Sequence, residues 1–173
     1  AETSLRVAVE AAERMVGARL RAVMLAVPGL RLTNRRIGVD LDLAGGCVTR
    51  EDVADCLAEG ARAASGESAA LHTIPVGWRV DAESAGADPV GLAGTTLTAE
   101  ILQIRARAPH FANYESLIER CGLRLSGALA APFAAGEAVL VEDEKELGVV
   151  MIDIGAASTD YAVYENGALV DCG

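Results

Sequence analysis

Positive charge is scarce in this sequence. Its 15 Lys and Arg residues stand against 25 Asp and Glu residues, so the net charge is −10, and no basic stripe offsets it. Long-range repulsion from that charge opposes binding to nucleic acid or to an anionic membrane. No apolar run approaches the roughly 20 residues that a membrane-spanning helix needs, and a charged-then-apolar leader is lacking. We therefore expect a soluble chain and, because it starts with Ala rather than Met, a fragment.

Clustered metal ligands are lacking as well. The four cysteines lie far apart without a Cys-x-x-Cys pair, and neither histidine has a group of Cys or acidic residues beside it. This spacing is wrong for a zinc knuckle, so we expect reduced thiols in a cytoplasmic protein. Structural or exposed roles are expected for the histidines. The residues concerned are Cys47, Cys56, Cys121, Cys172, His72 and His110.

Apolar residues are plentiful, at 51% of the chain with a mean hydropathy of +0.29, so a real core can form. Their periodicity changes between the helical and the extended type along the chain, which predicts a mixed α/β fold. Thr49 begins a capping box that starts one helix, and Gly17 ends another. We expect helices at about 5–17, 49–64, 109–121 and 132–141, strands at 22–27, 37–43, 70–81, 97–106 and 123–129, a turn at 65–68 and a solvated charge run at 142–146.

Two of these strands carry a more detailed prediction. Pro75 lacks a backbone donor, which places residues 70–81 at a sheet edge or introduces a bulge. Residues 97–106 place Leu97, Ala99 and Ile101 on one face. The other face carries Leu102, Ile104 and Ala106.

Two acids and the single tryptophan have structural interpretations. Asp40 and Asp42 alternate with apolar residues in the strand at 37–43. We interpret them as its solvated face rather than as paired catalytic carboxylates. Trp78 is equally compatible with a packing anchor and with a partner contact.

Residues 148–160 carry the strongest functional signal. The apolar run from Val149 to Ile154 is broken only by Asp153, and that density predicts a strand covered on both faces. A carboxylate in such a strand loses solvation and is usually kept near a cation, a donor or a ligand. Gly155 removes the side chain that would hold a phosphate away from the backbone. Short polar groups follow at Ser158, Thr159 and Asp160.

A hairpin completes this segment. A second strand at 161–165 ends at Asn166-Gly167, the dipeptide that type I′ turns prefer, before an apolar stretch resumes at 168–170. From the residues alone, an ordinary hairpin with an acid at its mouth remains the alternative to a phosphate site.

The motif from Asp153 to Asp160, followed by this hairpin, resembles the second phosphate motif of the actin-like ATPase superfamily. That resemblance implies cofactor-binding roles for five residues and assigns no catalytic residue. Asp153 would act on Mg²⁺ through water, while the Gly and Thr region would lie against the β- and γ-phosphates of ATP. Ala157 departs from the pattern, because the superfamily has its second Gly there. The five residues are Asp153, Gly155, Ser158, Thr159 and Asp160.

Four further segments resemble, in the right order, the FtsA family of bacterial actin-like cell-division proteins. They are 71–75 with 80–81, 88–94, 135–140 and 143–149. The resemblance covers nearly the whole chain and implies an α/β fragment of an actin-like (ribonuclease H-like) fold with an α+β inserted subdomain, 1C. The implied divisions are the end of the 1A helix (1–17), inserted 1C (18–106), resumed 1A (107–146) and the start of 2A with the phosphate hairpin (147–173).

The family resemblance also implies a function. The intact parent would bind ATP and Mg²⁺ with weak or no ATPase activity, polymerise, and link the division ring to the inner face of the cell membrane. This fragment alone would hold little or no nucleotide, because it has no first phosphate loop. Its 1C subdomain would contact FtsN and neighbouring protomers. FtsZ and the membrane would be reached through regions absent here.

Two alternatives share this architecture. One is the actin-like scaffold of type IV pilus assembly. The other is a sugar-kinase-type enzyme, which is the weaker alternative because the sequence offers no second acid with a substrate pocket.

Overall fold

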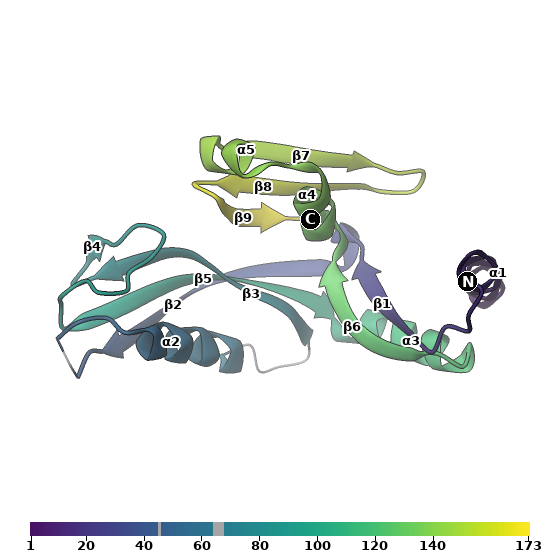
Figure 1. Cartoon of the computed structure of the whole chain (residues 1–173), viewed down its shortest axis with the longest axis horizontal. Coiled ribbons are helices and arrows are strands. Elements are labelled where there is room, and N and C mark those ends of the chain that lie inside the picture. Colours follow the sequence, from purple (N-terminus) through teal and green to yellow (C-terminus); the bar gives the residue numbers. More distant parts are fainter. Residues whose placement is uncertain (45, 64–67) are drawn as a thin grey trace.

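A computed structural model describes residues 1–44, 46–63 and 68–173 (Figure 1). The predicted helix end at 64 and most of the turn after it lie outside these residues. The elements are α1 (Glu2–Val16), β1 (Ala22–Val27), η1 (Gly29–Arg31), β2 (Leu32–Asp42), α2 (Arg50–Arg62), β3 (Ser68–Val80), β4 (Glu83–Ser84), β5 (Thr96–Arg107), α3 (Ala108–Arg120), β6 (Arg124–Ala130), α4 (Ala131–Val139), α5 (Glu142–Leu147), β7 (Val149–Ile154), β8 (Thr159–Glu165) and β9 (Ala168–Cys172).

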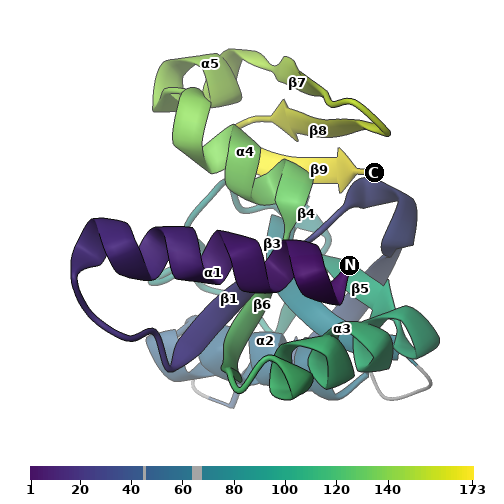
Figure 2. The same cartoon turned by 90° about the vertical axis from the view of Figure 1, so that its right-hand side faces the viewer.

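The strands of the described residues form three sheets, and the mixed α/β fold class is confirmed. A four-stranded antiparallel sheet has the order β2-β5-β3-β4, a three-stranded antiparallel sheet has the order β7-β8-β9, and β1 pairs with β6 in parallel. Figure 1 shows the three-stranded sheet over one face of the four-stranded sheet and α2 against the other. In Figure 2, α1 crosses in front of β1 and β6.

The predicted local signals are present at the helix ends and at the hairpin turn. The Asp52 amide donates to Thr49 Oγ1 at 3.2 Å and the Thr49 amide donates to Asp52 Oδ2 at 2.8 Å, which completes the capping box. Gly17 caps α1 with φ 73°. Asn166 and Gly167 have φ values of 51° and 79°, the two positive values that a type I′ turn requires.

Strand β5 belongs to two cores, as its alternation predicts. Leu97, Ala99 and Ile101 pack in the core that α2 covers, where Trp78 is also buried as an anchor. The opposite face supplies a second core, between β1, β6, α4 and the three-stranded sheet, through Leu102, Ile104 and Ala106. Among the described residues, neighbouring β3 is partnered on its outer side by the two residues of β4 alone. Its register shifts between Pro75 and Gly77, so Pro75 lies at a bulge and on an edge, as predicted.

One burial prediction is wrong, and another fails at a single residue. Strand β7 is covered on one face only, because α4 packs against one side of its sheet, and Val150, Ile152 and Ile154 are 55%, 60% and 80% exposed. The charge run at 142–146 forms the separate helix α5, and four of its five residues are exposed as predicted. Its Lys145 is only 4% exposed and pairs with Glu137 of α4.

Candidate functional site

The predicted phosphate motif forms the turn that joins β7 to β8, together with the strand ends beside it, and we call this end of the hairpin its mouth. Asp153 pairs with Asp160 and Ile154 pairs with Thr159 in the antiparallel ladder. The chain then turns tightly, because the Gly155 amide donates to the Ser158 carbonyl at 2.9 Å. A Cβ on Gly155 would lie 3.2 Å from that carbonyl oxygen, closer than most Cβ contacts. Glycine therefore permits the turn to close.

Four of the five predicted residues lie at this mouth and are exposed: Asp153, Gly155, Ser158 and Thr159. The carboxylate of Asp153 is exposed to water, so the prediction of a desolvated acid inside a covered strand is wrong. Exposure leaves this carboxylate open to a hydrated cation, which is the form in which Mg²⁺ usually meets protein. Across the described residues, His, Cys, Asp and Glu side chains do not gather in metal-binding groups of three.

Asp160 lies apart from the other four. It is only 8% exposed, and its Oδ2 accepts a hydrogen bond of 3.1 Å from the amide of Gly29, the residue that opens η1. Its Oδ1 is buried and has no hydrogen-bond partner. The structure therefore brings together Asp153, Gly155, Ser158 and Thr159, and it turns Asp160 toward the end of β1 instead.

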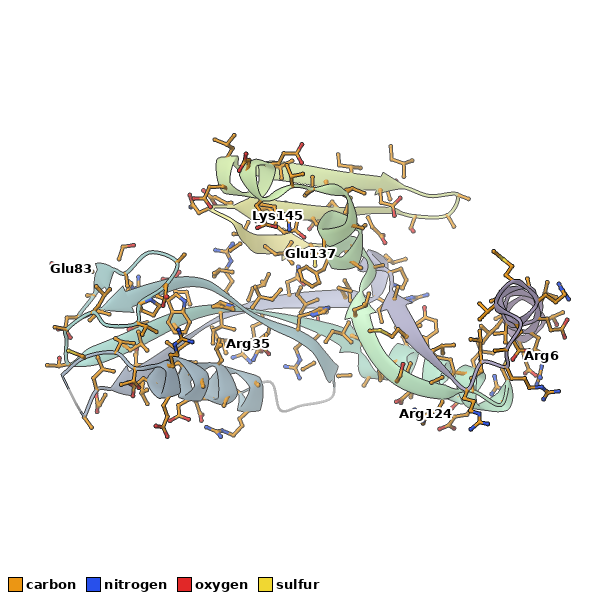
Figure 3. All side chains as sticks on the ribbon, viewed as in Figure 1. Arg6, Arg35, Glu83, Arg124, Glu137 and Lys145 are labelled. Carbon is orange, nitrogen blue, oxygen red and sulfur yellow. The ribbon has the colours of Figure 1, made fainter. Side chains whose placement is uncertain are left out.

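Sequence reasoning missed the polar cluster that fixes α5 to the hairpin. Lys145 Nζ lies 3.1 Å from Glu137 Oε2 and 3.0 Å from Glu142 Oε1, and Figure 3 shows Lys145 beside Glu137. The hydroxyl of Tyr164 donates to Glu137 Oε1 at 3.1 Å. Burial, together with the nearby Glu137 charge, raises the pKa of Tyr164. A run of four acids and one lysine gave no signal that the lysine would be covered.

Histidine His72 joins β3 to α4. Its Nε2 accepts a hydrogen bond of 2.9 Å from the Ala130 amide, and its ring lies 4.7 Å from that of Phe133. Burial lowers the pKa of His72, which favours the neutral ring that this acceptor role requires. A structural role was the prediction for this residue, and the contacts agree with it.

A hollow of about 730 Å³ lies between β3, the loop after β4 and the turn at Asn166 and Gly167. The predicted site residues do not line it. No helix of the described ranges has both the length and the apolar content that crossing a membrane requires.

Residues 30–104 match the family model described as "SHS2 domain inserted in FTSA". We call this segment the SHS2 domain. It corresponds to the four-stranded sheet with α2, apart from the last residues of β5.

Curated relatives match over almost the whole chain. The cell division protein FtsA of Rhizobium meliloti (strain 1021) is 35% identical over 170 residues, which are 98% of this chain and 38% of that protein. FtsA of Escherichia coli (strain K12) is 34% identical over 94% of this chain and 39% of its own length. FtsA of Neisseria meningitidis is 33% identical over 96% of this chain and 40% of its own length. The chain thus spans about two fifths of these relatives.

A solved structure shares the fold. A chain of the PilM-PilN type IV pilus biogenesis complex aligns with a TM-score of 0.60 over 98% of this chain and 47% of its own length, at 17% identity. That identity supports the arrangement of elements only. Sequence identity along almost the whole chain and the match to the inserted domain agree with each other: the chain resembles a segment of the FtsA cell-division proteins that includes the SHS2 domain inserted in them.

Proposed function

We propose that this chain is the part of an ATP-binding, actin-like cell-division protein that holds one half of the nucleotide site together with an interaction domain. The observation that supports nucleotide binding is the exposed hairpin mouth, where the tight turn at Gly155 places Asp153 beside Ser158 and Thr159. Turns of this kind, short and poor in side chains, let a phosphate approach the backbone.

Each residue of the mouth has a proposed role in the intact parent. Asp153 would hold the water shell of Mg²⁺, since this ion keeps several waters and binds through one or two carboxylates and the nucleotide phosphates. Ser158 and Thr159 would present their hydroxyls to the β- and γ-phosphates of ATP, and Gly155 would leave room for them. Asp160 would contribute to the same cofactor site indirectly, because its hydrogen bond to Gly29 fixes the backbone next to Thr159. The intact parent would bind ATP with weak or no ATPase activity.

The proposed subdomain division keeps the four predicted segments with one adjustment. Strand β1 pairs with β6, which lies outside the predicted insertion of 18–106. This pairing favours a start of 1C after β1, near residue 30, where the match to the SHS2 domain also begins. The first 1A segment (1–17) would then extend through β1, whereas the second 1A segment (107–146) and the 2A start (147–173) remain as proposed.

Partners and location follow from the family and are part of the proposal. The SHS2 domain would contact FtsN and neighbouring protomers, so that the parent polymerises on the inner face of the cell membrane at the division site. FtsZ and the membrane would be bound by portions of the parent outside this chain. The fold likeness to the pilus complex, at 17% identity, does not favour a pilus function.

The experiment is a titration of a fluorescent ATP analogue with Mg²⁺, using this chain and a protein of the relatives' full length. We expect the longer protein to bind and this chain to bind little, because half of the site is outside it. Asp153→Ala should weaken binding by about tenfold or more, since Mg²⁺ relies on few carboxylates. Glu165→Ala, an exposed acid at the far end of β8, is the control. Equal binding by the Asp153 variant would end the assigned role.

A further inference from the structure

The hairpin and the SHS2 domain meet along a line of polar contacts that the proposed function does not use. On the hairpin side this line follows β8 and β9, and on the other side it follows η1 and the first half of β2. We call it the β2-β9 seam. Its members are Gly29, Asn34, Arg36, Asp160, Asp171 and Gly173.

The first contact of the seam is at Gly29. Asp160 accepts from its amide at 3.1 Å. The packing is so close that a Cβ on Gly29 would lie 2.0 Å from the carbonyl carbon of Gly173 and 3.1 Å from Asp160 Oδ1. Because Asp160 is the last residue of the phosphate motif, the motif ends at a residue bonded to the chain that enters the SHS2 domain.

Two side chains of β2 continue the seam. The side-chain Nδ2 of Asn34 donates to Asp171 Oδ1 at 2.6 Å and also to the Cys172 carbonyl. Arg36 Nη2 donates to the Val170 carbonyl at 2.9 Å. Both residues share the face of β2 that points away from α2, because side chains alternate along a strand. The first strand of the SHS2 domain therefore holds β9 at consecutive positions.

The hairpin in turn connects this seam to the phosphate motif. The Tyr161 hydroxyl donates to Asp171 Oδ2 at 3.1 Å, and the Tyr161 and Gly173 backbones exchange hydrogen bonds of 2.7 and 3.0 Å. Buried apolar side chains of both parts, among them Leu32 and Cys172, lie in one core beneath. A movement of the loop at 155–158 would therefore be transmitted to β2 through these hydrogen bonds and this core.

We propose that the β2-β9 seam couples the conformation of the phosphate hairpin to the position of the SHS2 domain. Asn34 and Asp160 act as positioning residues in this coupling and touch no ligand. The coupling itself is inferred from the contacts alone. Its role in binding rests on the proposed function: a nucleotide at the hairpin mouth and a partner on the SHS2 domain would change each other's affinity by the same factor.

Hydrogen exchange of this chain without nucleotide tests the coupling. Arg36→Ala removes an exposed side chain that holds β9, and Arg35→Ala is its matched control, since Arg35 is exposed on the opposite face of the same strand. Gly29→Ala forces the junction apart, and Gly38→Ala is its control, because a Cβ on Gly38 meets nothing within 4 Å. Asn34→Ala and Asp160→Ala complete the set.

We expect the β2 and η1 variants to speed exchange in peptides covering 149–165 by about threefold to tenfold, as the loss of one hydrogen bond allows. Asp160→Ala should in turn speed exchange in peptides covering 32–42. The two controls should leave both regions unchanged. Exchange in peptides from α2 shows whether a substitution at a buried residue unfolds the whole chain. If it does, the result for the exposed Arg36→Ala variant tests the coupling.

Changes confined to the strand that carries each substitution would overturn the coupling. The test contains no ATP, so failure of nucleotide binding and failure of the coupling are separate results.

Discussion

The SHS2 domain and the phosphate hairpin use similar aliphatic residues to different ends. In the SHS2 domain, Ile101 is fully buried between β5 and α2. In the hairpin, Ile152 stands on a strand of the same character and is 60% exposed, because only one face of its sheet is covered. The comparison teaches that an apolar run predicts a strand, while the number of layers around the sheet decides what the run contributes to stability.

The sharpest way to break this comparison is one substitution made in both places. Ile101→Ala should lower the free energy of unfolding by about 2–5 kcal/mol, as large-to-small changes in a packed core do. Ile152→Ala should change it by less than about 0.5 kcal/mol, as exposed positions do. Urea denaturation of both variants measures the difference. Equal losses would mean that the outer face of β7 is covered in solution.

A second substitution asks whether polar contacts replace the missing layer. Lys145→Met should cost about 1–2 kcal/mol, because it removes the cation between Glu137 and Glu142 while both acids can still reach water. Arg124→Met, at an exposed cation on β6, is the control. Urea denaturation measures the loss of stability, and hydrogen exchange of the α5 amides shows whether that helix is loosened. An unchanged midpoint would show that the ion pairs add nothing to the anchoring of α5.

The helix cap of α2 offers a change confined to the SHS2 domain. Thr49→Ala removes the acceptor for the Asp52 amide and should cost about 1 kcal/mol. Glu51→Ala, at the exposed position between them, should leave stability nearly unchanged. Faster exchange at the start of α2, with none at the hairpin, is the expected pattern. Faster exchange in both regions would mean that the start of α2 does not open independently of the hairpin.

The smallest expected effect is a pH dependence at His72. Burial lowers the pKa of His72 below the ordinary 6.5, so the unfolded chain takes up a proton at a pH where the folded chain does not. The contribution of the neutral His72 to the free energy of unfolding is complete above pH 6.5 and is lost as the pH falls below that value. His72→Gln cannot titrate, so its denaturation midpoint should fall less between pH 7.5 and about 5 than that of the wild type. Parallel profiles would exclude this role for His72.

Local signals in the sequence predicted much of this fold. Thr49 with Asp52, Asn166 with Gly167, and Pro75 act through their own backbone neighbourhood, and each feature is present. The two faces of β5 were also predictable, since alternation fixes which side chains share a face. The match of the hairpin mouth to a phosphate motif was likewise local, and its function stays a prediction.

The remaining features depend on distant neighbours. Nothing in the run around Asp160 indicates that its carboxylate meets Gly29, which lies 131 positions away in sequence. Lys145 is buried because α4 and β8 converge on it, and no periodicity of a short charged segment records that. The exposure of Ile152 likewise reflects how many elements pack on its sheet. Local pattern supplied faces and turns, whereas burial came from tertiary packing.

The two-faced strand β5 bears on how such an inserted unit can be exchanged between proteins. Three of its side chains belong to the core of the part that surrounds the SHS2 domain, so removing the domain would expose that core to water. Substitutions at Leu102 or Ile104 therefore affect the packing of both parts. A chimaera between two relatives should transfer β5 together with α4 and β9, so that the side chains of the shared core stay matched.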